Sequence, residues 1–187
     1  MDEIVKAAIR KWPNVPACYG WLGLSARGDW YLRDEATQNA GSFQSADGRS
    51  KGSKLDHTGL IEFISRNYQC DAAGNWYFQN GPQQVFVELE ITPWIWRIES
   101  PTVLSFHSRI SKPLTNQCSQ DIDGRVYMQT DVGFGMIHSN DVPLAAEFIE
   151  QGIWRVGQKI DGDLGYLHHF CKSPLDKKRA DVSRPSA

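Results

Sequence analysis

The chain has 187 residues and a formal net charge of −2 at pH 7. A chain of this length buries roughly 70% of the surface that its unfolded form exposes, so we expect a full hydrophobic core. The near-neutral charge argues against a protein that binds nucleic acid through a broad basic face, because such binding depends on clustered Lys and Arg. The four cysteines are dispersed and contain no CxxC pair, which fits neither a zinc module nor a disulfide-rich secreted scaffold.

No apolar run is long enough for a signal peptide or a membrane span. The sequence therefore predicts a cytoplasmic protein with no membrane partner. We expect it to be a monomer or homodimer. Seven Trp, six Tyr and eight Phe are more aromatic residues than a minimal core needs. We expect some of them to line a surface or a cleft.

The first third of the chain predicts a helix, a hairpin and a loop. Residues 2–11 have the apolar spacing of a short amphipathic helix that ends before Pro13. Residues 19–32 predict a hairpin. Residues 34–54 are polar and lack apolar periodicity, so they predict a long loop or mobile insertion.

A second helix and hairpin follow. Residues 55–68 carry a helical apolar stripe. Residues 71–97 predict a hairpin and a strand that alternates from Val85 to Ile91. Further strands are expected at 103–109 and 125–130, a helix at 141–152 and a disordered tail at 172–187.

A hairpin motif recurs after fifty residues, with a turn glycine that leads into an aromatic strand. Duplication explains the recurrence economically, although DxxG is also common hairpin chemistry because Gly adopts positive φ without steric cost. The sequence predicts an α+β fold of duplicated antiparallel hairpin-plus-helix units, divided at 1–100 and 101–171. The matching positions are Asp71, Gly74, Tyr77 and Gln79 in the first copy and Asp121, Gly124, Tyr127 and Gln129 in the second.

Two carboxylates and a tryptophan share one parity along the predicted strand. Glu88 and Glu90 would project from one face of a strand, where they could act as acid and base or bind a cation. With Trp94 they would form a wall suited to cationic or peptidic ligands. A half-buried strand with a solvated face has the same pattern, and Pro93 interrupts it.

Polar side chains also gather at the end of the second helix and in the turn after it. Such amide and guanidinium groups bind peptide bonds or nucleobase edges, although a tight turn with solvated side chains has the same composition. His57, beside the helix start, is a candidate for anion binding or for a local cap. The polar cluster consists of Arg66, Asn67, Gln79, Asn80 and Gly81.

Known catalytic and cofactor motifs do not occur. The sequence has no GxSxG, GxxxxGKS or HExxH. Acidic pairs at 121–123 and 161–163 lack the closing acid of a calcium loop. We therefore predict no catalytic residue, no metal site and no cofactor.

The segments GDWYLRD, at 28–34, and LDHTGLIEFISRNYQCDAAGNWYFQNGPQQVFVELEITPWIWRIE, at 55–99, resemble an uncharacterised proteobacterial family of unknown function. More distantly they resemble domain-of-unknown-function family 1285 (DUF1285). The resemblance covers about residues 19–150 and is strongest at 55–97. It implies a duplicated core, a C-terminal half similar to a pleckstrin-homology barrel capped by a helix, and a ligand site between the halves. The family has no established activity, and the insertion at 34–54 and the tail after 165 depart from its pattern. The matching site residues are His57, Arg66, Asn67, Gln79, Asn80, Gly81, Glu90 and Pro93.

The leading hypothesis is a non-enzymatic regulatory or scaffolding protein, with a role in signal transduction. It would bind a small ligand or peptide in an inter-unit cleft, within a groove formed by the 57–68 helix and the 79–97 hairpin.

Two other functions compete with this hypothesis. The first is a hydrolase that uses Glu88 or Glu90 as a general base, with a nearby histidine at 57 or 107. The second is nucleic-acid binding through exposed aromatic residues, namely Trp30, Trp76 and Tyr77.

Overall fold

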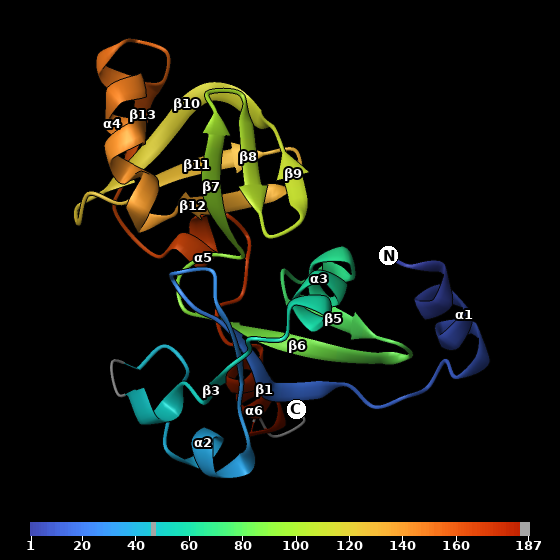
Figure 1. Cartoon of the computed structure of the whole chain (residues 1–187). Helices are drawn as coiled ribbons and strands as arrows, with labels where there is room; N and C mark the ends of the chain where they lie inside the picture. The colour runs from blue at the N-terminus through green and yellow to red at the C-terminus, as the bar shows by residue number, and fades with distance from the viewer. Residues whose placement is uncertain (46–47, 184–187) are drawn as a thin grey trace. The chain divides into compact units, whose positions relative to one another are not determined.

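The computed structural model describes residues 1–45 and 48–183, except for the side chain of Gln158. The chain forms two compact units, each built around its own sheet (Figure 1). The expected division near residue 100 differs from this one because strand β7 (Trp94–Ser100) pairs with strands of the second unit. Unit 1 comprises Met1–Ser25, Asp29–Glu90 and His169–Ala187, and unit 2 comprises Ala26–Gly28 and Ile91–His168.

Unit 1 contains a six-stranded sheet with the order β3-β2-β1-β6-β5-β4. Strands β1 and β6 are parallel, and all other neighbours are antiparallel. The strands are β1 (Cys18–Leu24), β2 (Trp30–Leu32), β3 (Ser53–Lys54), β4 (Tyr68–Cys70), β5 (Trp76–Asn80) and β6 (Gln83–Leu89).

Helices α3 and α6 cover opposite faces of this sheet. Phe63 of α3 packs edge-on against Phe78, with ring centroids 5.5 Å apart, and Phe78 is the cross-strand partner of Val85. Glu88 has the opposite parity to Val85 along β6 and accepts a hydrogen bond from the first turn of α6. The helices of unit 1 are α1 (Glu3–Lys11), α2 (Glu35–Asn39), α3 (Thr58–Arg66) and α6 (Pro174–Ser183), with a 3₁₀ turn η1 (Gly48–Ser50).

The segment predicted to be a mobile loop at 34–54 contains ordered elements. Asp34 caps α2, because its carboxylate accepts a hydrogen bond from the Thr37 backbone N–H at 2.8 Å. Phe43 is fully buried and covers β1 at Gly23, where the absence of a side chain leaves room for its ring. The loop prediction is wrong for α2, η1 and β3, and residues 46–47 lie outside the described part.

The tail predicted to be disordered at 172–187 contains helix α6. The Ser173 hydroxyl accepts a hydrogen bond from the Asp176 backbone N–H at 3.2 Å, and Pro174 occupies the first helical position. The prediction is wrong for residues 174–183, and the rest of the tail, at 184–187, lies outside the described residues.

Unit 2 contains a seven-stranded sheet with the order β13-β10-β11-β12-β7-β8-β9. The pairs β12–β7 and β10–β13 are parallel. Besides β7, the strands are β8 (Val103–Phe106), β9 (Arg109–Ser111), β10 (Pro113–Asp121), β11 (Val126–Thr130), β12 (Gly133–Ile137) and β13 (Arg155–Ile160). The helical elements are η2 (Ser139–Asp141), α4 (Val142–Glu150) and α5 (Leu164–Leu167).

Six strands of each sheet share one topology. The orders β4-β5-β6-β1-β2-β3 and β10-β11-β12-β7-β8-β9 have the same directions at every pairing. The carboxylates of Asp71 and Asp121 each accept a hydrogen bond at 2.9 Å from the backbone N–H four residues later. The predicted α+β class is confirmed. Duplication and the pleckstrin-homology likeness stay predictions, and the shared strand order supports duplication.

Most tryptophans lie in the two cores. Trp30 and Trp76 are 0% and 8% exposed, so the proposed stacking of nucleobases on them has no structural support. Trp12 and Trp21 are half exposed. Within residues 1–45 and 48–183, no helix is long and apolar enough to cross a membrane.

Candidate ligand-binding site

A pocket of about 590 Å³ opens in unit 1 between α3 and the sheet. Ligand pockets commonly have roughly 300–1,000 Å³ and mainly apolar walls with a few polar groups. The lining residues are Cys18, Trp21, Leu22, Leu32, Arg33, Asp34, Thr37, Ser53, Leu60, Ile64, Phe78, Asn80 and Val85.

The walls follow from the periodicity of the elements that carry them. Leu60 and Ile64 are four residues apart in α3, so they project from one face of the helix. Phe78 and Val85 are cross-strand partners in β5 and β6, so they project from one face of the sheet. The apolar stripe of the helix thus faces the apolar face of the sheet.

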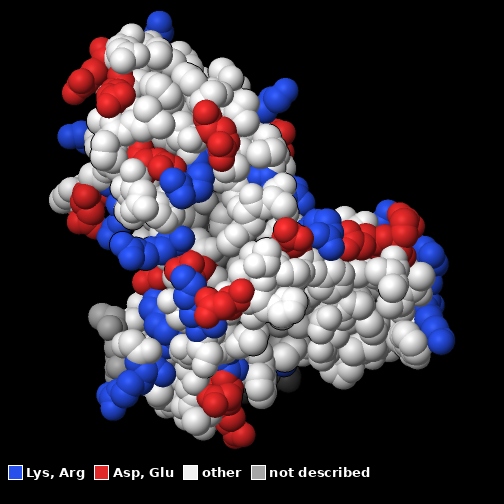
Figure 2. All heavy atoms as spheres, in the orientation of Figure 1, with Lys and Arg blue, Asp and Glu red and all other residues white. Residues whose placement is uncertain are grey.

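Two large apolar side chains at the pocket remain exposed. Trp21 of β1 is 48% exposed and Leu32 of β2 is 47% exposed. Figure 2 shows an area without charged side chains over β1 and β6, while charged residues gather over α1. Exposed apolar surface beside a pocket is typical of a site that meets an apolar partner or ligand.

The charged groups at the pocket are already engaged within the protein. The Asp34 carboxylate accepts hydrogen bonds from the backbone N–H and hydroxyl of Thr37 at 2.8 and 2.6 Å. Its hydrogen bond to the Thr37 side chain lowers the pKa of Asp34. The Arg33 guanidinium donates to three backbone carbonyls. By contrast, the Asn80 side chain makes no hydrogen bond within the described residues and is available to a ligand.

The one thiol in the lining is a poor nucleophile. Burial raises the pKa of Cys18, so the thiol is protonated at neutral pH. The lining contains no histidine that could serve as its base. The arrangement suits binding rather than covalent chemistry.

Of the nine residues predicted to bind a ligand, only Asn80 lines this pocket. His57 caps α3, because its Nδ1 accepts a hydrogen bond from the Leu60 backbone N–H at 3.1 Å. Arg66 and Asn67 hold the start of α1. Arg66 lies 3.3 Å from the Asp2 carboxylate, and the Asn67 Oδ1 accepts a hydrogen bond from the Asp2 backbone N–H at 2.8 Å.

The remaining turn residues also have structural roles. Gln79 is buried, and its Nε2 donates to the Gly81 carbonyl at 2.9 Å. Gly81 has a φ of +57°, in the left-handed region that glycine adopts most easily. These two residues shape the β5–β6 turn.

The predicted carboxylate and tryptophan wall is not formed. Glu88 is buried and bonds to the Leu175 backbone N–H at 3.1 Å, whereas Glu90 follows the end of β6 and pairs with Lys51 at 2.7 Å. Trp94 belongs to unit 2, where it is buried and stacks on Trp96 with ring centroids 5.2 Å apart. No cluster of three or more metal-ligating side chains occurs in the described part of the chain.

Sequence reasoning missed most of the pocket. The apolar pattern predicts a packing face at Leu60 and Ile64, and it predicts a hairpin that contains Trp21 and Leu32. Neither prediction indicates that these residues line a pocket. A half-exposed Trp and Leu on adjacent strands are the signal of an open site, but exposure is not visible in sequence.

The family model DUF2944, described as "Protein of unknown function (DUF2946)", matches residues 1–183. The chain belongs to the DUF2944 family. This confirms the prediction of an uncharacterised family of unknown function. No curated protein matches this DUF2944 chain. Among solved structures, a DUF1285 family protein from Shewanella baltica OS155 is similar, with a TM-score of 0.49 and 13% sequence identity. The match covers 72% of the DUF2944 chain and 97% of the Shewanella chain.

Proposed function

We propose that this chain is a non-enzymatic regulatory protein that holds a small apolar molecule in the pocket of unit 1. The pocket itself carries the proposal, since eight of its thirteen lining residues are apolar or thiol side chains and its volume fits a small molecule. Burial of apolar ligand surface contributes roughly 25 cal/mol per Å². The apolar walls therefore supply the main driving force for binding.

The ligand is neutral. The two charged residues at the pocket, Arg33 and Asp34, have opposite signs, so their formal charges cancel, and both make hydrogen bonds within the protein. A ligand with a net charge would therefore place an unpaired ion in an apolar site, which costs several kcal/mol. A hydroxyl or amide at one end of the ligand would meet the side chain of Asn80.

The hydrolase hypothesis gains no support from the carboxylates on which it depends. Within the residues that the structure describes, no hydrogen bond or ion pair joins Glu88 to a histidine. Glu90 is held by Lys51 at 2.7 Å. His107 lies in unit 2, with its Nε2 3.0 Å from the carbonyl oxygen of Gly28. We therefore do not propose a hydrolase.

A thermal-shift screen tests the proposal. Neutral apolar compounds, each compared with its carboxylate analogue, are added to the whole chain. A ligand at 100 times its dissociation constant stabilises a fold by about 2.7 kcal/mol, which raises Tm by roughly 5–11 °C for a chain of this size. We expect such shifts from neutral compounds only. A flat screen, or larger shifts with the carboxylates, would contradict the proposal.

A further inference from the structure

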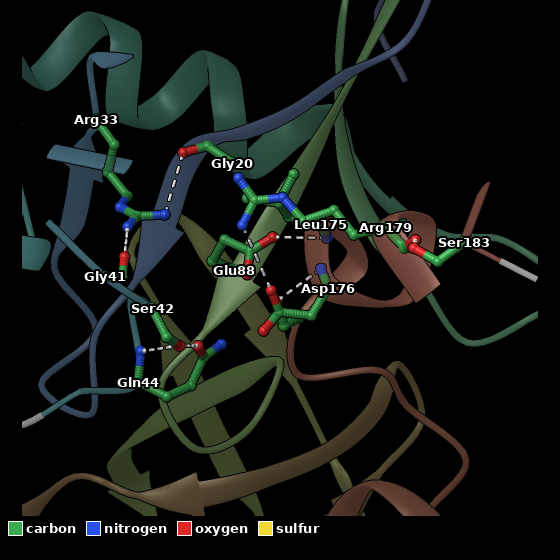
Figure 3. A network of polar contacts seen from close by, with 11 residues as sticks. Gly20, Arg33, Gly41, Ser42, Gln44, Glu88, Leu175, Asp176, Arg179 and Ser183 are labelled. Atoms are coloured by element: carbon green, nitrogen blue, oxygen red, sulfur yellow. Dashed lines mark hydrogen bonds and ion pairs between the residues drawn. The ribbon is translucent and has the colours of Figure 1, made fainter. Parts of the chain in front are cut away.

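A second cavity, of about 260 Å³, lies in unit 1 at the first turn of α6. It differs from the apolar pocket because most of its lining is polar or charged. Figure 3 shows side chains from β6, α6 and the segment after β2 that converge around it. The lining residues are Arg33, Gln38, Asn39, Gly41, Ser42, Phe43, Glu88, Ser173, Leu175, Asp176 and Arg179.

Two buried side chains of opposite charge line this cavity without pairing to each other. Arg33 is 2% exposed and Glu88 is 1% exposed. Their bonds run to other groups, although each contributes to the electrostatic surroundings of the other. Burying a charge costs free energy unless the charge is paired and hydrogen-bonded. A bound ligand that pairs with both groups would offset this cost.

Arg33 retains unused hydrogen-bonding capacity. Its Nε donates to the Ser50 carbonyl at 2.8 Å, its Nη1 to the Gly20 carbonyl at 3.3 Å and its Nη2 to the Gly41 carbonyl at 2.6 Å. A guanidinium has five N–H groups, and two of them have no acceptor in the described part of the chain. Because Gly41 also lines the cavity, the charged end of Arg33 lies at its wall.

Glu88 likewise keeps free acceptor capacity. One carboxylate oxygen accepts a hydrogen bond from the Leu175 backbone N–H at 3.1 Å. Burial raises the pKa of Glu88 and outweighs the effects of the Ser173 hydroxyl and the Leu175 N–H, which lower it. An ionised carboxylate has about four acceptor positions, so roughly half remain open.

A second pair of oppositely charged side chains lies at the exposed mouth of the cavity. Asp176 and Arg179 of α6 approach to 3.9 Å, and both side chains are 59% exposed. With Arg33 and Glu88 the lining therefore holds two cations and two anions, and its formal charge is zero. A ligand with only one charge would satisfy one buried group and leave the other unpaired.

We propose that this cavity binds a small zwitterion of the amino-acid class, with its carboxylate at Arg33 and its ammonium group at Glu88. The volume of about 260 Å³ equals that of roughly nine waters at about 30 Å³ each, which limits the ligand to a small molecule. Phe43 and Leu175 provide apolar contacts for its carbon atoms. The lining of this cavity shares only Arg33 with that of the apolar pocket, and the two proposals are tested with different ligands, so either proposal can fail without the other.

Calorimetric titration of the whole chain with alanine tests this assignment. The matched ligands are N-acetylalanine, which lacks the ammonium group, and alaninamide, which lacks the carboxylate. We expect alanine to bind and each derivative to bind at least tenfold more weakly. We also expect tryptophan to bind more weakly than alanine because of its size. No binding of alanine, or equal binding of the derivatives, would overturn the proposal.

Two matched variants locate the site. Glu88→Gln keeps the shape and removes the charge, so it should weaken alanine binding at least tenfold. Glu90→Gln removes a carboxylate of the same segment that does not line the cavity, so it should leave binding unchanged. Should Glu88→Gln fail to fold, Asp176→Asn at the exposed mouth takes its place, with a smaller loss expected. Equal effects of the Glu88 and Glu90 variants would refute the assignment.

Discussion

The substitution Gly23→Ala tests whether the segment after β2 is packed as the structure describes. A Cβ at Gly23 would lie 2.6 Å from Cζ and 2.7 Å from Cδ2 of Phe43. These distances are far shorter than a carbon contact of about 3.5–4.0 Å. Phe43 is fully buried, so its ring cannot move aside without loss of packing.

The cost of this overlap follows from known effects of overpacking. An added methyl group in a closely packed core destabilises by about 1–3 kcal/mol. At roughly 2–4 °C per kcal/mol for a chain of this size, Tm should fall by about 2–12 °C. In a Phe43→Ala background the overlap disappears, and Gly23→Ala should then be neutral or stabilise by up to about 1 kcal/mol.

Urea denaturation of the four proteins in this double-mutant cycle measures the coupling directly. We expect the cost of Gly23→Ala to vanish when Phe43 is removed. The reasoning is refuted if Gly23→Ala is neutral in the wild type, or if it costs the same in both backgrounds. In either case Phe43 does not cover β1.

Two further predictions concern pH. Asp141→Asn should destabilise unit 2 by about 1–3 kcal/mol in urea denaturation, since Asp141 bonds to Arg97 at 2.6 and 2.9 Å and to the Ile98 backbone N–H. Burial raises the pKa of Asp141, but these bonds lower it by more, so the net shift is downward. The stabilisation by Asp141 is therefore present above about pH 4 and is lost as pH falls. The Asp141→Asn variant should not show this loss of stability in acid. Glu88 has a raised pKa, chiefly through burial, so its favourable contribution is present below about pH 4.3 and is lost as pH rises. Glu88→Gln should therefore flatten that decline and leave the chain at least as stable at pH 7, and a less stable variant at pH 7 would contradict this.

Local periodicity predicted the elements whose pattern is set by their own sequence. The stripe through Leu60 and Ile64 gave α3 and its packing face, and His57 was rightly considered as a cap. The alternation from Val85 predicted β6. The predicted groove between the 57–68 helix and the 79–97 hairpin includes Asn80, which lines the pocket. These signals are local, so a single sequence is enough to recognise them.

Elements anchored by distant contacts were not predictable in the same way. Helix α6 has a local start signal in Ser173, Pro174 and Asp176, but the polar composition of the tail outweighed it. Its anchor on Glu88 joins residues 87 positions apart, which no periodicity reveals. The pocket depends on the parallel pairing of β1 with β6, which places Cys18 opposite Val85 and Leu22 opposite Val87.

The most direct test of the apolar pocket is a fluorescence titration with a neutral apolar probe, N-phenyl-1-naphthylamine. Leu60→Trp adds bulk to the pocket wall, while Glu62→Trp places the same side chain on an exposed position of α3 outside the lining. We predict that the wild type and Glu62→Trp bind the probe equally and that Leu60→Trp binds it at least tenfold more weakly. Absence of binding to the wild type, or equal binding by all three proteins, would contradict the claim that unit 1 holds an apolar ligand in this pocket.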